Sequence, residues 1–162
     1  MSTRRFGRQK QANPSDQACA EFGGPLAVLG VSCDYHDSAA ALCIDGEVIA
    51  AVQQERLSRI KHDAALPVDA IGSCLAIAGM SPDDLTCVVY YEKPLNVVGR
   101  FFATRQRQGP RSLGPFLRDL PPLLGHNLMI GDRLDRGLRH LGATWPVRID
   151  YAEHHVSHAA AA

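Results

Sequence analysis

The sequence lacks the spacings that mark the common nucleotide-binding and hydrolase sites. It contains no G-x-x-x-x-G-K-[ST], which excludes a P-loop, and no G-x-G-x-x-G after an apolar run, which excludes the usual dinucleotide fingerprint. The G-x-S-x-G turn that carries the nucleophile of α/β-hydrolases is also missing. Any chemistry in this chain must therefore rest on another set of residues.

Paired cysteines and long apolar runs are lacking as well. The five cysteines are odd in number and show no C-x-x-C spacing, so we expect neither a disulfide framework nor a zinc knuckle. Most lie in apolar runs, which favours reduced, buried thiols. No run approaches the ~20 apolar residues of a membrane span. An N-terminal Arg-Arg pair resembles an export signal, but no apolar region follows it. We expect a cytoplasmic protein without a membrane partner.

The length and the charge pattern set broad limits. The chain of 162 residues suffices for one domain with a core, or for a piece of a larger protein. Its net charge is zero, with acidic residues concentrated in 26–92 and basic residues in 99–148. The basic half could face phosphates or an acidic surface of the same protein, but it is more typical of a solvated helical face, and we expect no nucleic-acid partner. Residues 1–24 are polar and predict a disordered leader.

Three apolar runs predict three successive strands, at Leu26–Val31, Ala39–Ile44 and Val48–Val52. The Asp45-Gly46 pair between the second and third runs indicates a hairpin, because both turn positions need a positive φ. Further elements follow from apolar spacing, Gly79 and the prolines. They are, in order, a helix at 67–78, a strand at 86–91, two or three helices within 99–142 (the last from about 131), a strand at 147–151 and a helix start at 153.

A polar segment between the first two predicted strands is the first candidate site. It contains Asp34, His36, Asp37 and Ser38, and polar groups between buried strands are costly unless they are satisfied or used. One interpretation is a simple polar turn. The other is a loop that positions a phosphate or carbonyl substrate, with His36 as a hydrogen-bond donor or proton shuttle.

Two further groups could bind ligands. A basic group downstream could neutralise phosphate oxygens, or it could be a solvated charged turn. Near the end of the chain, His154 and His158 are four residues apart on a predicted helix and share a face, which suits two imidazoles on one metal. A hydrogen-bonded or surface pair is the alternative, and a metal would need ligands from elsewhere. The basic group comprises Arg56, Arg59, Lys61 and His62.

Four motifs in order resemble the N-terminal part of the NodU-type O-carbamoyltransferases. They are V-L-G-V-S-x-D-Y-H-D-S-A-A-A-L, D-G-E-V-I-A-A-x-Q-x-E-R-L-S-R-I-K-H-D, Y-E-K-P and E-H-H-V-S-H-A-A-A-A. The resemblance implies an α/β fold, the first half of an actin-like ATPase (ASKHA) domain. Its mixed sheet would open with a three-stranded β-meander and carry a helical insertion. Residues 25–162 would be a truncated portion of the catalytic domain.

The resemblance also implies an activity. Family members transfer a carbamoyl group from carbamoyl phosphate, through a carbamoyl-adenylate made with ATP, to a hydroxyl of a sugar or other small molecule. An iron-type divalent metal takes part, and a missing C-terminal portion would supply its remaining ligands and the adenylate-forming domain. The implied residues are His36 and Lys61 for catalysis, Asp34, Asp37, Ser38 and Arg59 for substrate binding, and His154 and His158 for the metal.

Other functions stay open at this point. Proteins of related fold carbamoylate a cysteine during hydrogenase maturation or modify a tRNA adenosine, although Y-H-D-S-A-A and Y-E-K-P fit the small-molecule branch better. A degenerate module that binds a metal or a partner without catalysis is the alternative from another class. Because the predicted site is partial, we expect residues 1–162 alone to be inactive.

Overall fold

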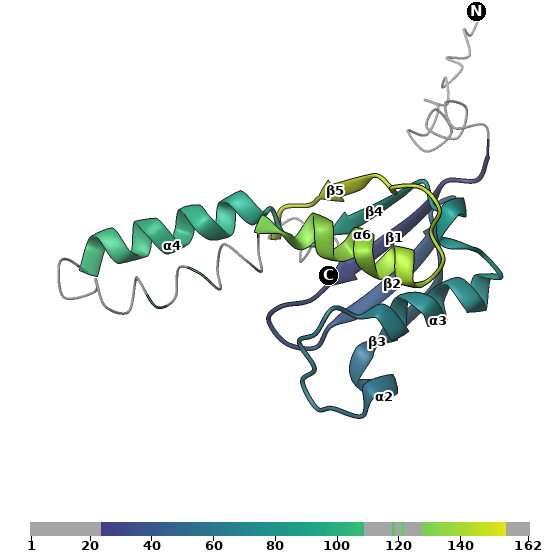
Figure 1. Ribbon diagram of the computed structural model, residues 1–162, viewed down its shortest axis with the longest axis horizontal. Helices are drawn as coiled ribbons and strands as arrows, with labels where there is room; N and C mark the ends of the chain where they lie inside the picture. The colour runs from purple at the N-terminus through teal and green to yellow at the C-terminus, as the bar shows by residue number, and fades with distance from the viewer. Residues whose placement is uncertain (1–23, 109–117, 119–120, 122–127, 155–162) are drawn as a thin grey trace, which may run out of the picture.

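The computed structural model describes residues 24–108, 118, 121 and 128–154. Five strands form one mixed sheet in the order β3-β2-β1-β4-β5 (Figure 1). This arrangement confirms the predicted α/β class and each of the five predicted strands. The strands are β1 (Ala27–Ser32), β2 (Ala39–Ile44), β3 (Glu47–Gln53), β4 (Cys87–Tyr90) and β5 (Ile149–Tyr151).

The first three strands form the predicted β-meander. β1 pairs antiparallel with β2, and β2 pairs antiparallel with β3. At the turn between β2 and β3, Asp45 has a φ of 51° and Gly46 a φ of 87°, the conformation that a tight hairpin requires. β4 then pairs parallel to β1, and β5 parallel to β4. The ends of β1, β4 and β5 therefore meet at one edge of the sheet.

The helices follow the prediction in part. Gly79 ends α3 with a φ of 65°, as its position predicts. α4 begins at Pro94, before the predicted helical region at 99, since proline is favoured in the first helical turn. None of the described helices combines the length and the apolar character that a membrane crossing requires. The helices are α2 (Gln54–Ser58), α3 (Val68–Ala78), α4 (Pro94–Gln108) and α6 (Ile130–His140), with a short 3-10 turn at Pro82–Asp84.

The sequence predicts no helix at α2, only a charged segment from Arg56. Its first residue, Gln54, is buried with 5% of its surface exposed. The Gln54 amide Nε2 donates to Asp69 Oδ2 at 2.8 Å, and the N–H of Ala70 donates to Gln54 Oε1 at 3.0 Å. These contacts with the start of α3 stabilise α2. They join residues 15 and 16 positions apart, so the local sequence pattern does not predict them.

α3 and α6 cover one face of the sheet (Figure 1). Alternate residues of β1 point toward them, so Leu29 is fully buried while its neighbour Gly30 is not. From α6, Leu134 and Leu138 are each 1% exposed. Gly137 lets α6 lie close to Leu66, in the segment before α3. A Cβ atom at position 137 would lie only 3.1 Å from Leu66 Cδ2. α6 thus reaches the edge of the sheet where β1 ends.

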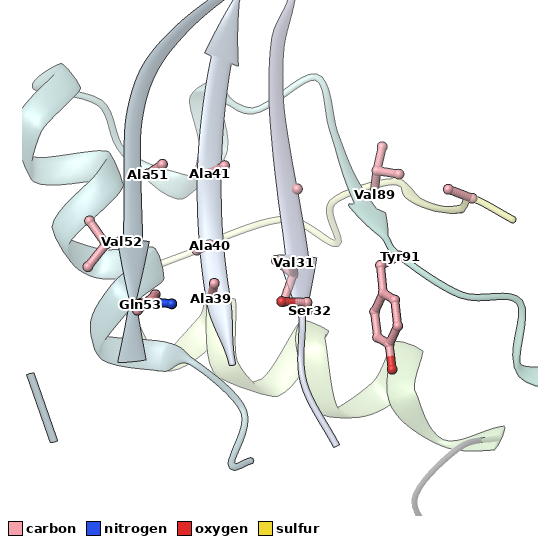
Figure 2. Close-up of a pocket in the computed structure, with 12 residues that line it drawn as sticks. Val31, Ser32, Ala39, Ala40, Ala41, Ala51, Val52, Gln53, Val89 and Tyr91 are labelled. Atoms are coloured by element: carbon pink, nitrogen blue, oxygen red, sulfur yellow. The ribbon is translucent and has the colours of Figure 1, made fainter. Parts of the chain in front are cut away.

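The opposite face of the sheet is lined by small side chains. Figure 2 shows this face with the helices behind the strands. It holds a shallow, open cavity of about 610 Å³. Residues that line it include Gly30, Ala39, Ala41, Ala51, Val89 and Tyr91.

Four cysteines lie within the described residues and all are free thiols. Cys33 and Cys74 are buried, and Cys43 and Cys87 are partly buried. This agrees with the reduced thiols that the sequence predicts. The predicted leader, Cys19 and His158 lie outside the described residues.

Candidate functional site

The loop between β1 and β2 carries the polar segment that the sequence singles out. It is tied down at both ends by the chain after α2: the N–H of Asp34 donates to Ala64 O and the N–H of Ser38 to Asp63 O, each at 2.9 Å. The hydroxyl of Tyr90 donates to Cys33 O at 3.2 Å. Burial raises the pKa of Tyr90, so this phenol remains a donor. The loop is therefore held in place by the end of the second motif with the residue after it, and by Tyr90, which directly precedes Y-E-K-P.

Asp37 joins two imidazoles across this loop. His36 Nδ1 lies 2.9 Å from Asp37 Oδ2, and His62 Nδ1 lies 2.9 Å from Asp37 Oδ1. A carboxylate only accepts, so both histidines present a protonated Nδ1 to it. The hydrogen bonds from His62 and His36 hold the pKa of Asp37 below its usual value. His36 is thereby left with Nε2 available on an exposed ring.

Glu55 of α2 completes a small polar cluster around His62. The N–H of His62 donates to Glu55 Oε2 at 3.2 Å. One ligand-type atom from each of Asp37, Glu55 and His62 lies within 4.8 Å of the other two. The three groups could hold a cation, although the hydrogen bonds that His62 makes already explain their closeness. The cluster ties α2 to the loop that carries His36.

Asp34 is held from the opposite side of the loop by Arg133 of α6. The guanidinium donates from Nη1 to Asp34 Oδ2 at 2.6 Å and from Nη2 to Asp34 Oδ1 at 2.8 Å. Both side chains are largely buried, with 18% and 13% of their surface exposed. These hydrogen bonds raise the pKa of Arg133. Asp34 is thus already engaged at both oxygens.

A cavity of about 400 Å³ brings three of the four motifs together. It is lined by Tyr35 from the first motif, Tyr91 and Glu92 from Y-E-K-P, His154 from the last, and Arg100 of α4. The rings of Tyr91 and His154 meet edge to face with centroids 5.6 Å apart. Lys93 Nζ donates to Glu153 Oε1 at 3.1 Å beside them.

Two charged residues that line this cavity, Glu92 and Arg100, have opposite charges. Glu92 is buried, with 9% of its surface exposed, and forms an ion pair with Arg100. The pKa of Tyr91 is raised, chiefly by burial and then by the negative charge of Glu92. Tyr91 is consequently a neutral hydrogen-bond donor next to His154 at ordinary pH.

A sequence model of the carbamoyltransferase N-terminus matches residues 27–162, most of the chain. The chain belongs to the carbamoyltransferase family. Its resemblance to the N-terminal part of NodU-type members, predicted from the four motifs, is confirmed.

Two relatives cover most of this carbamoyltransferase chain. An uncharacterised protein of Synechocystis is 41% identical over 138 residues, which are 83% of the chain and 22% of that protein. The nodulation protein NolNO of Sinorhizobium fredii is 38% identical over 126 residues, 76% of the chain and 17% of NolNO. The chain thus spans about a fifth of the length of these relatives.

The predicted site residues of the carbamoyltransferase chain lie in three settings. His36 and Asp37 are hydrogen-bonded partners, and Lys61 is exposed beside His62. Arg59 is exposed and ends α2 with a φ of 58°. Ser38 is fully buried, and within the described part of the chain its hydroxyl has no hydrogen-bond partner. The roles assigned to these residues stay predictions.

Of the two histidines expected to bind the metal, only His154 lies among the described residues, so the fit of the site to a metal is judged on His154. Its ring lies at the wall of a cavity that also contains the carboxylate of Glu92. Imidazole nitrogen suits an iron-type divalent ion, so His154 fits as one ligand. Its predicted partner His158 lies outside the described residues.

Sequence reasoning missed the contributions of α2, α4 and α6 to the site. Glu55 and Arg100 contact motif residues seven and eight positions away in the sequence, and Arg133 contacts Asp34 across 99 positions. Glu55 stands inside the second motif, so its position could have suggested a role. For Arg133, one of several arginines in a basic segment, the sequence offers no such signal.

Proposed function

We propose that the whole protein transfers a carbamoyl group from carbamoyl phosphate, through a carbamoyl-adenylate formed with ATP, to a hydroxyl of a small molecule or sugar. The observation that carries this proposal is the cavity lined by Tyr35, the chain neighbour of His36, where residues from three motifs of this carbamoyltransferase chain meet. The fourth motif contacts the same loop through His62 and Asp37. The described residues would form the transfer site.

In the proposed step, the acceptor oxygen attacks the carbamoyl carbon and the bond from that carbon to the AMP oxygen breaks. The acceptor proton passes to His36 Nε2, the nitrogen left available by the hydrogen bond to Asp37. Asp37 holds the tautomer and the ring orientation, as the carboxylate does in other carboxylate–histidine pairs. Lys61 would stabilise the developing negative charge.

The metal in this proposal is a divalent ion, Fe²⁺ by family resemblance, with His154 and His158 as two of its ligands. When bound, it would supply Lewis-acid stabilisation to phosphate or carbamoyl oxygens. Tyr91 contacts the His154 ring and would fix its orientation. The other ligands would come from the remainder of the protein.

We also propose the finer fold and setting. The β-β-β-α-β order with β2 antiparallel to β1 supports the first half of an actin-like ATPase domain. The free thiols support a cytoplasmic location. Ser38, Arg59, Asp34 and Asp37 would shape the substrate side of the loop, with Asp34 acting through its contact with Arg133.

The test is turnover by the whole protein. Incubation with radiolabelled carbamoyl phosphate, ATP and a panel of simple sugars and aminoglycosides should give a labelled product and AMP. AMP formation should depend on carbamoyl phosphate. A protein that binds metal but releases no AMP beyond the level without carbamoyl phosphate would instead be a non-catalytic module. Residues 1–162 tested alone should give no labelled product.

A further inference from the structure

Arg133 connects α6 to the loop that carries His36, across 99 positions of the sequence. The loop residue that it contacts, Asp34, has a φ of 74°. A non-glycine residue in this left-handed region costs free energy and persists only where its surroundings hold it. The two hydrogen bonds from Arg133, at 2.6 and 2.8 Å, are among those surroundings.

This ion pair differs from an ordinary surface pair. On the same helix, Arg139 Nε contacts Asp135 Oδ2 at 2.8 Å, but both side chains are more exposed, at 49% and 30%. Exposed ion pairs of that kind contribute little to the stability of the fold. The Arg133–Asp34 pair is bidentate and mostly buried, so its geometry is fixed as well as favourable.

The position of the pair gives it a consequence for His36. Asp34 lies two residues before His36, and both sit in the single loop from Cys33 to Ser38. The main chain of this loop is anchored at its ends by Ala64 and Asp63. Near the start of the loop, the hydrogen bonds between the Asp34 side chain and Arg133 also attach the loop to α6. The direction in which the loop leaves β1 therefore depends on that contact.

We infer that Arg133 is a positioning residue that sets the loop conformation in which His36 meets Asp37. This inference rests on the proposed function for its link to turnover, but its structural part does not. Arg133 acts through Asp34 and the main chain, since its guanidinium donates a hydrogen bond to each carboxylate oxygen of Asp34. α6 thereby becomes part of the site.

The experiment compares four forms of the whole protein. Arg133→Met removes the charge, Arg133→Lys keeps the charge but loses the paired hydrogen bonds, and Asp34→Asn with Arg133→Met removes both charges. Arg139→Met is the matched control on the same helix. Each form is examined by NMR with isotope-labelled histidine, which reports the tautomer of His36, and by kcat, acceptor KM and the pH profile.

The expected result is a changed His36 spectrum in all three forms that lack the bidentate pair. The Nδ1–H tautomer should lose its dominance, and kcat should fall about 10- to 100-fold with little change in acceptor KM. The pH profile of kcat should shift, because the contact of His36 with Asp37 is altered. Arg139→Met should match the wild type in every measurement.

An unchanged His36 spectrum and kcat in the folded variants would overturn the inference. If Arg133→Met does not fold because Asp34 is left as a buried, unpaired charge, the lysine and double variants decide. Wild-type protein that shows no carbamoyl transfer would count against the proposed function alone. The NMR comparison would then still decide whether Arg133 positions His36.

Discussion

The ring of Tyr91 lies edge to face against the ring of His154, with their centroids 5.6 Å apart. Tyr91 follows β4 and His154 follows β5, and these strands are parallel neighbours. Parallel strands deliver the residues that follow them to one edge of the sheet. The parallel pairing of β4 and β5 therefore explains how two motifs that are distant in sequence come to line one cavity.

Truncation of Leu134 should destabilise the fold, because this side chain packs α6 onto the sheet with 1% exposure. We expect Leu134→Ala to lower the free energy of unfolding by about 2–5 kcal/mol. Urea unfolding followed by circular dichroism measures the change. Leu95→Ala, at a position 75% exposed on α4, is the control and should change stability by less than about 0.5 kcal/mol. Equal stability of the two variants would contradict the placement of α6.

The Asp37 carboxylate should stabilise the fold in a pH-dependent way. Its pKa is lowered in the folded protein by hydrogen bonds from His62 and His36. A group with a lowered folded pKa stabilises the fold above its unfolded pKa, near 3.8, and this contribution is lost as the pH falls through the folded value.

Wild type should therefore have a higher urea midpoint than Asp37→Asn at neutral pH, and the difference should shrink as the pH falls below the unfolded pKa near 3.8 and through the lower folded pKa. Asp132→Asn, exposed on α6, serves as the control. A difference between wild type and Asp37→Asn that stays constant over the whole acid range would show that the histidine contacts do not hold this carboxylate.

Much of the strand pattern could be predicted because it depends on residues that are close together in the sequence. The three apolar runs and the Asp45-Gly46 turn specify the meander without help from distant residues. The helix α3 was equally readable from its apolar spacing and its glycine end. In contrast, α2 exists because Gln54 contacts the start of α3, and a five-residue segment has no local pattern that reveals such support.

The motif residues of the candidate site could be singled out from the sequence, whereas the contacts that support them could not. His36, Lys61 and His154 stand in recognisable motifs. The contact of Arg100 with Glu92 depends on where α4 begins. The contact of Arg133 with Asp34 depends on how α6 docks, which is a matter of tertiary packing. The strand order, which places β4 beside β1, likewise depends on pairing between distant segments such as Val28 and Cys87.

The thiol of Cys33 should resist alkylation in the native protein. Burial, followed by the negative charge of Asp34, raises the pKa of Cys33 to about 12, and only 2% of the residue is exposed. Since the thiolate is the reactive form, iodoacetamide at about pH 8 should modify the more exposed Cys43 well before Cys33. Peptide mass mapping after timed labelling measures both. Faster labelling of Cys33 would mean that the loop opens readily.

Metal binding should depend on the histidine pair. In the whole protein, His154→Ala and His158→Ala should each remove the bound metal, because loss of one imidazole leaves an incomplete ligand set. His140→Ala, at the exposed end of α6, should keep it. Elemental analysis of the purified proteins gives the metal content. Retention of the metal in either of the first two variants would remove that histidine from the ligand set.

In the proposed function, the loop carrying His36 hosts the transfer step. A single-turnover measurement with His36→Asn in the whole protein tests it most directly, with carbamoyl-adenylate formation and its consumption by the acceptor followed separately. We predict that the adenylate still forms while its transfer slows about 10²- to 10⁴-fold, with unfolding unchanged. Transfer at the wild-type rate would contradict the account.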